Sequence, residues 1–130
     1  MAIFDTSFII DILRNREEAL TLRKTLDNSE TEYFVSSPTI MELWEGALLS
    51  RSPKNEKEKI NDMLSSLNIL PLDAESAKRA AEISRTLLDK GEIIELEDVM
   101  IAGIAMENGE MVVTSDTHFT RIPGLKVLKY

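Results

Sequence analysis

Four acidic residues, far apart along the chain, are the side chains best suited to chemistry: Asp5, Glu42, Asp98 and Asp116. Carboxylate oxygens are the ligands that Mg²⁺ and Mn²⁺ take in proteins, whereas zinc and copper sites use more nitrogen and sulfur. If the four groups converge, repulsion between like charges protonates some of them unless a cation is present. A cation held in this way can activate water and neutralise charge on a phosphodiester. Taken together, the four residues indicate a site for Mg²⁺ or Mn²⁺.

Each of these residues also has a purely structural explanation. Asp5 can cap the helix that follows it, because Asp is a favoured N-cap residue. Glu42 falls outside the apolar arc of its helix, where a solvated surface position is the ordinary expectation. A carboxylate in the first helical turn, such as Asp98, is favoured by the helix dipole, and Asp116 can start a short helix. The metal-binding interpretation therefore depends on the four residues acting together.

Other catalytic chemistries have little support in the sequence. The chain has no cysteine, which excludes disulfides, thiolate zinc sites and cysteine nucleophiles. Its single histidine, His118, cannot supply a two-histidine acid–base pair, and we expect it near the rim of the site as a surface or hydrogen-bonding residue. The sequence contains no Gly-x-Ser-x-Gly elbow, phosphate-binding glycine loop or dinucleotide fingerprint.

The net charge opposes binding to nucleic acid. Fifteen Lys and Arg residues stand against twenty-three Asp and Glu residues, which gives a formal charge of −8. Because nucleic-acid binding rests largely on basic side chains meeting phosphates, an RNA substrate fits only if the acidic residues hold cations. We expect the basic residues Arg14, Arg16, Arg79 and Arg85 mainly to solvate helix faces.

Short apolar strands that alternate with helices are expected to position the acidic residues. Strands are predicted at residues 2–4, 33–35, 67–72, 111–114 and 126–128. Helices are predicted at 8–13, 16–27, from the pair at 37–38 to about 49, from the pair at 52–53 to 64, from 73 to a stop at Gly91, and at 98–108. Ser37-Pro38 and Ser52-Pro53 are typical helix starts. Such alternation favours a parallel sheet in a layered α/β fold. Functional residues of open parallel sheets lie beyond the strands' carboxyl ends, where Asp5 and Asp116 are expected.

The length of 130 residues predicts a single domain spanning residues 1–130. The N-terminus leads directly into a strand-like run rather than a signal peptide, and the apolar stretches are too short to cross a bilayer. We therefore expect a cytoplasmic protein without membrane contact.

Four motifs follow one another along the chain at characteristic separations. They are FDTSFIID at residues 4–11, TIMELWEG at 39–46, EDVMIAGIA at 97–105 and VTSDTHF at 113–119, with RIPGL at 121–125. As an ordered set they resemble PIN-domain ribonucleases, in particular the VapC-type toxins of prokaryotic toxin–antitoxin pairs. The resemblance covers the whole chain, and its specificity comes from the order of the motifs rather than from any one of them.

The resemblance implies a three-layer sandwich with a parallel sheet of about five strands in the order 3-2-1-4-5. It implies that Asp5, Glu42, Asp98 and Asp116 bind Mg²⁺ or Mn²⁺, and that Thr6 and Thr114 orient the first aspartate or a water. The implied activity is hydrolysis of RNA phosphodiester bonds by metal-activated water. Glu95 and Glu97 lie close enough in sequence to be candidates for supporting the metal ligands, although a solvated surface is the expectation for both.

The resemblance also implies partners, namely an RNA substrate, a cognate antitoxin protein and a second copy in a homodimer. In one place the sequence departs from many relatives, which carry Arg and Asn after the closing threonine where this chain has Ser115 and Asp116. The aspartate adds a potential metal ligand, and the missing arginine removes a phosphate contact. This departure bears on RNA affinity and sequence preference.

Three alternatives remain open at this stage. A housekeeping RNA-processing PIN nuclease would carry the same motifs, and a non-catalytic RNA-binding member would have lost them. A Mg²⁺-binding phosphotransfer receiver domain shares the architecture, but it needs an acidic pair after the first strand and an acceptor aspartate after the third. Here Asp5 stands alone, and Pro71-Leu72-Asp73 is a poor acceptor context.

Overall fold

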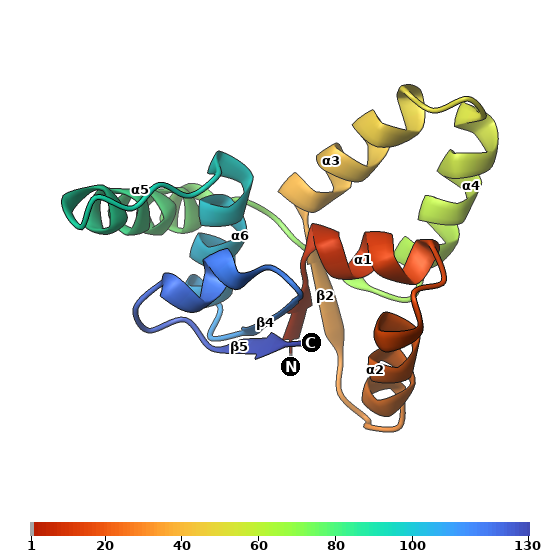
Figure 1. The fold of residues 1–130 in the computed structure, drawn as a ribbon, viewed down its shortest axis with the longest axis horizontal. Helices are drawn as coiled ribbons and strands as arrows, with labels where there is room; N and C mark the ends of the chain where they lie inside the picture. Colours follow the sequence, from red (N-terminus) through yellow and green to blue (C-terminus); the bar gives the residue numbers. More distant parts are fainter. Residues whose placement is uncertain (1) are drawn as a thin grey trace.

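A computed structural model describes residues 2–130, and its centre is a five-stranded sheet in the order β3-β2-β1-β4-β5 (Figure 1). The strands are β1 (Ala2–Phe4), β2 (Tyr33–Ser36), β3 (Asn68–Leu70), β4 (Met111–Thr114) and β5 (Val127–Lys129). All four neighbouring pairs are parallel. The predicted α/β fold and strand order are confirmed.

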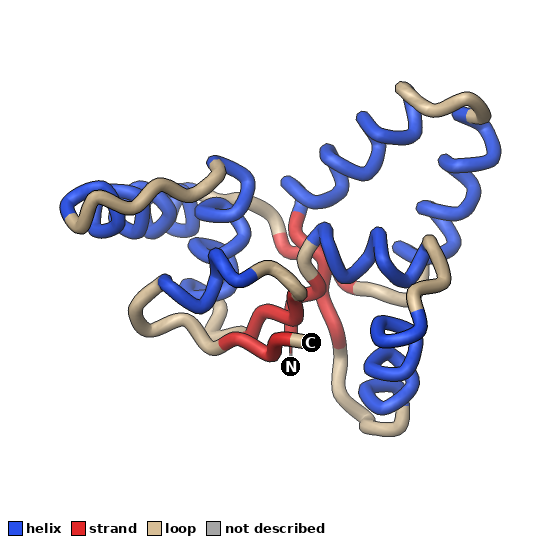
Figure 2. The backbone as a smooth tube through the Cα atoms, in the orientation of Figure 1, coloured by secondary structure: helices blue, strands red, loops and turns tan. Residues whose placement is uncertain are grey.

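Helices cover both faces of this sheet, which Figure 2 shows as the red strands between two groups of blue helices. Within residues 2–130 the helices are α1 (Thr6–Leu13), α2 (Glu17–Asp27), α3 (Ser37–Leu48), α4 (Pro53–Leu64), α5 (Ala74–Asp89), α6 (Leu96–Glu107) and the 3₁₀ helix η1 (Thr117–Arg121). Helices α1 to α4 lie on one side, and α5, α6 and η1 on the other. The protein is therefore a three-layer sandwich.

The helix starts follow the expected signals with small shifts. Ser36, one residue before the predicted pair, caps α3 by accepting a hydrogen bond from the backbone N–H of Thr39 at 3.3 Å. Asp73 caps α5 by accepting from the N–H of Ser76 at 2.8 Å. The helix expected from residue 16 begins at Glu17, because Asn15 takes a left-handed conformation with φ of 57° that separates it from α1.

Alternate residues of the central strands face two separate cores. Ile3 and Val112 point into the core with α5 and α6, whereas Phe4 and Val113 point into the core with α1 to α4. The ring of Phe4 stacks on Tyr33 with centroids 5.0 Å apart. Because both faces are covered, the strands lack the polar–apolar alternation of a half-exposed sheet.

Helix α6 is the most enclosed helix of the α5–α6 layer. Its residues 101–105 are all buried, as its nearly continuous apolar sequence predicted. A Cβ atom added to Gly103 would lie 2.6 Å from the backbone oxygen of Ser76 and 2.8 Å from the backbone nitrogen of Ala80. The backbones of α5 and α6 are therefore in direct contact, a feature that the sequence did not reveal. This contact fixes the start of α6, where Asp98 lies.

No helix between residues 2 and 130 is long and apolar enough to cross a membrane.

We predict that Gly103→Ala lowers the free energy of unfolding by about 1–3 kcal/mol, the range typical of overpacking in a rigid core. The matched control is Gly46→Ala in α3, where an added Cβ meets nothing within 4 Å. That substitution should instead stabilise the protein by about 0.5–1 kcal/mol, because alanine is the better helix former. Urea unfolding of both variants measures the difference. Similar shifts for the two would contradict the close approach of α5 and α6.

Candidate metal centre

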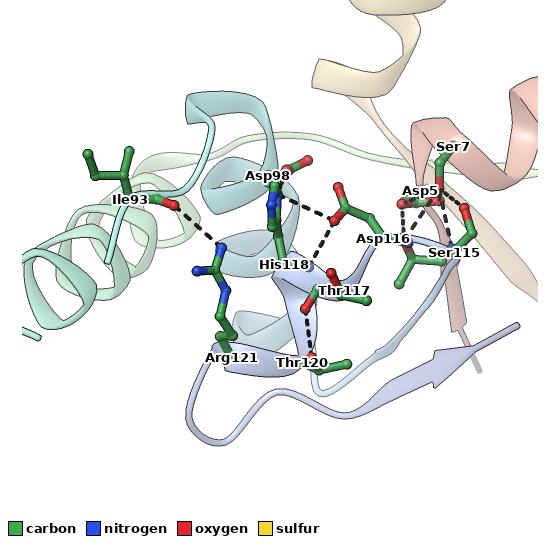
Figure 3. A network of polar contacts seen from close by, with 11 residues as sticks. Asp5, Ser7, Ile93, Asp98, Ser115, Asp116, Thr117, His118, Thr120 and Arg121 are labelled. Carbon is green, nitrogen blue, oxygen red and sulfur yellow. Dashed lines mark hydrogen bonds and ion pairs between the residues drawn. The ribbon is translucent and has the colours of Figure 1, made fainter. Parts of the chain in front are cut away.

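The acidic residues come together at the carboxyl end of the sheet, where the order of the strands reverses. Strand β1 pairs with β2 on one side and β4 on the other, so Asp5 directly follows the central strand. Asp116 lies two residues beyond the end of β4. Asp98 is in the first turn of α6, and Glu42 projects from α3. Figure 3 shows Asp5, Asp98 and Asp116 along one line of polar contacts.

Asp5 is buried, with only 2% of its surface exposed. One carboxylate oxygen accepts a hydrogen bond of 2.8 Å from the backbone N–H of Phe8, which caps α1. The hydroxyl of Ser7 lies 2.8 Å from each carboxylate oxygen, and the hydroxyl of Thr114 donates to the second one. Asp5 is therefore a helix cap and a member of the acidic group at the same time. Thr114 was expected here from the sequence, whereas Ser7 was not, although its position two residues after the aspartate was the available signal.

Glu42 is half-buried rather than a solvated surface residue. The hydroxyl of Thr6 donates a 2.8 Å hydrogen bond to one of its carboxylate oxygens and lies 3.1 Å from the hydroxyl of Thr39. Thr6 was expected to orient the first aspartate or a water, and the structure gives its hydroxyl Glu42 as partner instead. Helix α1 therefore positions the carboxylate that α3 carries.

Asp98, Asp116 and His118 form the tightest group of potential ligands. Each offers one ligand atom, and the three atoms lie within 4.8 Å of one another. The Nδ1 atom of His118 lies 3.3 Å from an oxygen of Asp116 and 4.0 Å from an oxygen of Asp98. Among the residues that the structure describes, Asp5 and Glu42 stand outside this group. His118 was predicted at the rim of the site, but it lies within the group of potential metal ligands.

The electrostatics show that the carboxylates share one environment. Burial raises the pKa of Asp5 to about 6. Burial also raises the pKa of Asp98 to about 7, and the negative charges of Asp116, Asp5 and Glu42 add to the rise. Burial raises the pKa of Glu42 as well, against the hydrogen bond from Thr6, which lowers it. Burial, assisted by neighbouring negative charges, therefore disfavours the ionised carboxylates unless protons or a cation are bound.

Basic side chains do little to neutralise this charge. Within residues 2–130, the only basic side chain within 4.0 Å of any of the four acidic residues is that of His118, which is charged only when protonated. Arg16 pairs with Asp11, Arg79 with Glu82 and Glu107, and Arg85 with Asp89. The expectation that these three arginines solvate helix faces stays a prediction. The charge of the site is left for a cation to balance.

The donor set fits a divalent metal ion. Hard divalent cations take carboxylate oxygens as ligands. The carboxylates here lie close together and have few positively charged neighbours. The Nδ1 atom of His118 is buried and has no hydrogen-bond partner within the described residues. An open parallel sheet with such a cluster at its switch point defines an α/β protein with a site suited to divalent cations.

Comparison with known proteins assigns the family within this class. The PIN domain family model matches residues 2–125. The tRNA(fMet)-specific endonuclease VapC of Salmonella typhimurium is 34% identical over 124 residues, which are 95% of this chain and 92% of that protein. The chain therefore belongs to the PIN-domain family. Asp73, which a receiver domain would need as phospho-acceptor, caps α5 instead, so that alternative is dropped.

Two solved structures agree with this assignment. The crystal structure of DNA-bound VapBC from Salmonella typhimurium has a TM-score of 0.88 and 32% identity, covering 99% of this chain and 98% of that chain. The structure of VapBC2 from Rickettsia felis, bound to a DNA fragment from its promoter, has a TM-score of 0.91 at 24% identity and the same coverage, which supports the fold alone.

We predict that Asp98→Asn stabilises the metal-free protein at pH 8 but has a much smaller effect at pH 5. The pKa of Asp98 is about 7 in the folded protein and near 4 in an unfolded chain. Between these values the folded state binds the extra proton, so stability falls as the pH rises. Each pKa unit corresponds to about 1.4 kcal/mol, so the gain at pH 8 should reach a few kcal/mol.

Thermal unfolding in excess chelator measures this gain at the two pH values. Asp89→Asn on the exposed side of α5 is the control for the same chemical change. If Asp98→Asn shifts the melting temperature equally at pH 5 and pH 8, Asp98 does not titrate in this range and the repulsion is absent.

Proposed function

We propose that this protein is a metal-dependent ribonuclease and the toxin of a type II toxin–antitoxin pair. The observation that carries the proposal is the gathering of buried and half-buried carboxylates at the switch point of a PIN fold. A relative that is 34% identical over nearly its whole length is named as a tRNA(fMet)-specific endonuclease. We further propose that residues 1–130 form one domain and that Mg²⁺ or Mn²⁺ is the ion.

The four acidic residues would hold the ion, and the neighbouring hydroxyl groups would keep them in place. Thr114 and Ser7 fix Asp5, and Thr6 fixes Glu42. Carboxylates held in this way need no rearrangement when a substrate arrives, which is the condition for electrostatic catalysis. The bound ion would supply an activated water and neutralise charge on the phosphodiester.

The acidic composition agrees with this mechanism on the condition that bound divalent ions attract the phosphates of the RNA. With a net charge of −8 and Arg16, Arg79 and Arg85 engaged by acidic neighbours, an RNA backbone meets an excess of negative charge on this protein. Divalent ions would therefore contribute much of the attraction for phosphate in the centre. The tRNA(fMet) named for the Salmonella relative is the first substrate to test.

An antitoxin is the proposed protein partner. The similar structure from Salmonella typhimurium is a VapBC complex at 32% identity, and in such a pair the toxin is held by its cognate protein. The homodimer implied by the family resemblance stays a prediction.

We predict that Asp116→Asn reduces RNA cleavage about 100-fold or more, because loss of even an outer partner of a metal ligand typically costs 10–100-fold. Cleavage of tRNA by the unaltered protein should stop in excess chelator and return with Mn²⁺. Asp89→Asn should cleave as the unaltered protein does, since Asp89 pairs with Arg85 on α5. Cleavage that continues in excess chelator would remove the metal from the mechanism.

We predict that Thr6→Val, which keeps the shape of the side chain, lowers cleavage about tenfold, as loss of a group orienting a metal ligand does. The cause would be the freed carboxylate of Glu42, which loses its 2.8 Å hydrogen bond. Thr86→Val is the control, because its hydroxyl bonds only the Glu82 backbone oxygen on the exposed side of α5. Initial rates at saturating Mn²⁺ test the comparison. Equal rates for the two variants would show that Thr6 does not position Glu42.

A further inference from the structure

We propose that His118 is a direct metal ligand, so that the ion is coordinated by Asp98, Asp116 and the Nδ1 atom of His118 and the centre prefers Mn²⁺ to Mg²⁺. The proposal deepens the proposed function, on which it rests. It adds a nitrogen donor to a site that the sequence predicted as oxygen-only.

The separations of the three ligand atoms suit one octahedral ion. Ligand atoms about 2.1 Å from such an ion lie roughly 3 Å apart when adjacent and about 4.2 Å apart when opposite. The Nδ1 atom of His118 lies 3.3 Å from Asp116 and 4.0 Å from Asp98, and all three ligand atoms fall within 4.8 Å. Figure 3 shows the imidazole ring next to the two carboxylates. Little movement is needed to place an ion between them.

The Nδ1 atom of His118 makes no hydrogen bond within the described residues. The side chain is 45% exposed, yet its Nδ1 atom is covered and has no hydrogen-bond partner within residues 2–130. The contact of 3.3 Å with Asp116 is therefore close without being a satisfactory hydrogen bond. A buried polar atom without a partner is unfavourable, because it has lost its hydrogen bonds to water. An ion shared with the two carboxylates would satisfy this nitrogen and the oxygens together.

The backbone holds the nitrogen in position. The N–H of His118 donates a 2.8 Å hydrogen bond to Asp116, which caps η1, and the next residue, Phe119, is fully buried. Arg121 at the end of η1 donates to the backbone oxygen of Ile93 at 3.5 Å, in the segment that leads to α6. The turn with Asp116 and His118 is therefore tied to the helix that carries Asp98.

A nitrogen ligand changes which ion fits best. Mg²⁺ takes oxygen ligands and keeps several waters, whereas neutral imidazole is a common ligand of transition metals. A centre with two carboxylates and one imidazole should therefore bind Mn²⁺ more tightly than Mg²⁺. The acidic residues alone would give a smaller difference between the two ions.

Electron paramagnetic resonance of bound Mn²⁺ tests the proposal directly. Because His118 is the only histidine in the chain, imidazole coupling in protein purified without a histidine tag can come from no other residue. We expect pulsed spectra to show a directly bound nitrogen that changes when histidine is labelled with ¹⁵N. Mn²⁺ titrations followed by the same signal give the affinity, independently of cleavage.

Two variants separate the ligand from its surroundings. His118→Phe keeps a ring but removes the nitrogen, and it should weaken Mn²⁺ binding about tenfold or more, as losses around metal ligands do. His118→Asn places an amide oxygen close to the same position and should restore much of the binding, with a smaller ratio of Mn²⁺ to Mg²⁺ affinity. Circular dichroism confirms that both variants fold.

The outcomes distinguish this proposal from the proposed function. Mn²⁺ that binds and supports cleavage without nitrogen coupling would overturn the role of His118 and leave the acidic centre intact. His118→Phe with unchanged Mn²⁺ affinity would overturn it as well. No Mn²⁺ binding to the unaltered protein would overturn both the ligand assignment and the metal-dependent mechanism.

Discussion

The burial of carboxylates beside one another at the carboxyl end of the sheet is the constraint on which the rest of the structure depends. Asp5 is buried, and the charges of Asp5, Glu42 and Asp116 all raise the pKa of Asp98. A group of this kind is stable only with bound protons or a bound cation. The parallel sheet meets this condition because it places the ends of two adjacent strands, from opposite ends of the sequence, side by side.

The fold holds these charges in place with small polar groups and close packing. Hydroxyl groups from Ser7 and Thr114 bind Asp5, and Thr6 binds Glu42. Asp98 is held by helix packing instead, because α6 is largely buried and its Gly103 lies against the backbone of α5. Neutral donors can orient a carboxylate without cancelling its charge, whereas a lysine or arginine would compete with the cation for the site.

Much of the fold could be predicted from the sequence, because the strand pattern and the helix caps are local signals. Asp5 and Asp73 cap helices as their positions indicated, and all five strands lie where apolar runs were found. Glu42 shows the limit of such signals. The helical wheel of α3 predicts a solvated position for Glu42. It cannot predict the hydrogen bond from Thr6, because Thr6 lies on α1, in another part of the chain. Ser7, Gly103 and the Nδ1 atom of His118 depend on tertiary contacts in the same way.

The hydrogen bond between Thr114 and Asp5 joins residues 109 positions apart in the chain, and this separation has a consequence for synthesis. A ribosome releases the first strand well before the strand and turn that complete the acidic group, because Thr114 follows Asp5 by 109 positions. An unfinished chain therefore lacks Thr114, Asp116 and His118 together, and it cannot assemble the centre. A nascent chain therefore acquires the acidic centre only after β4 and the turn that follows it have been made.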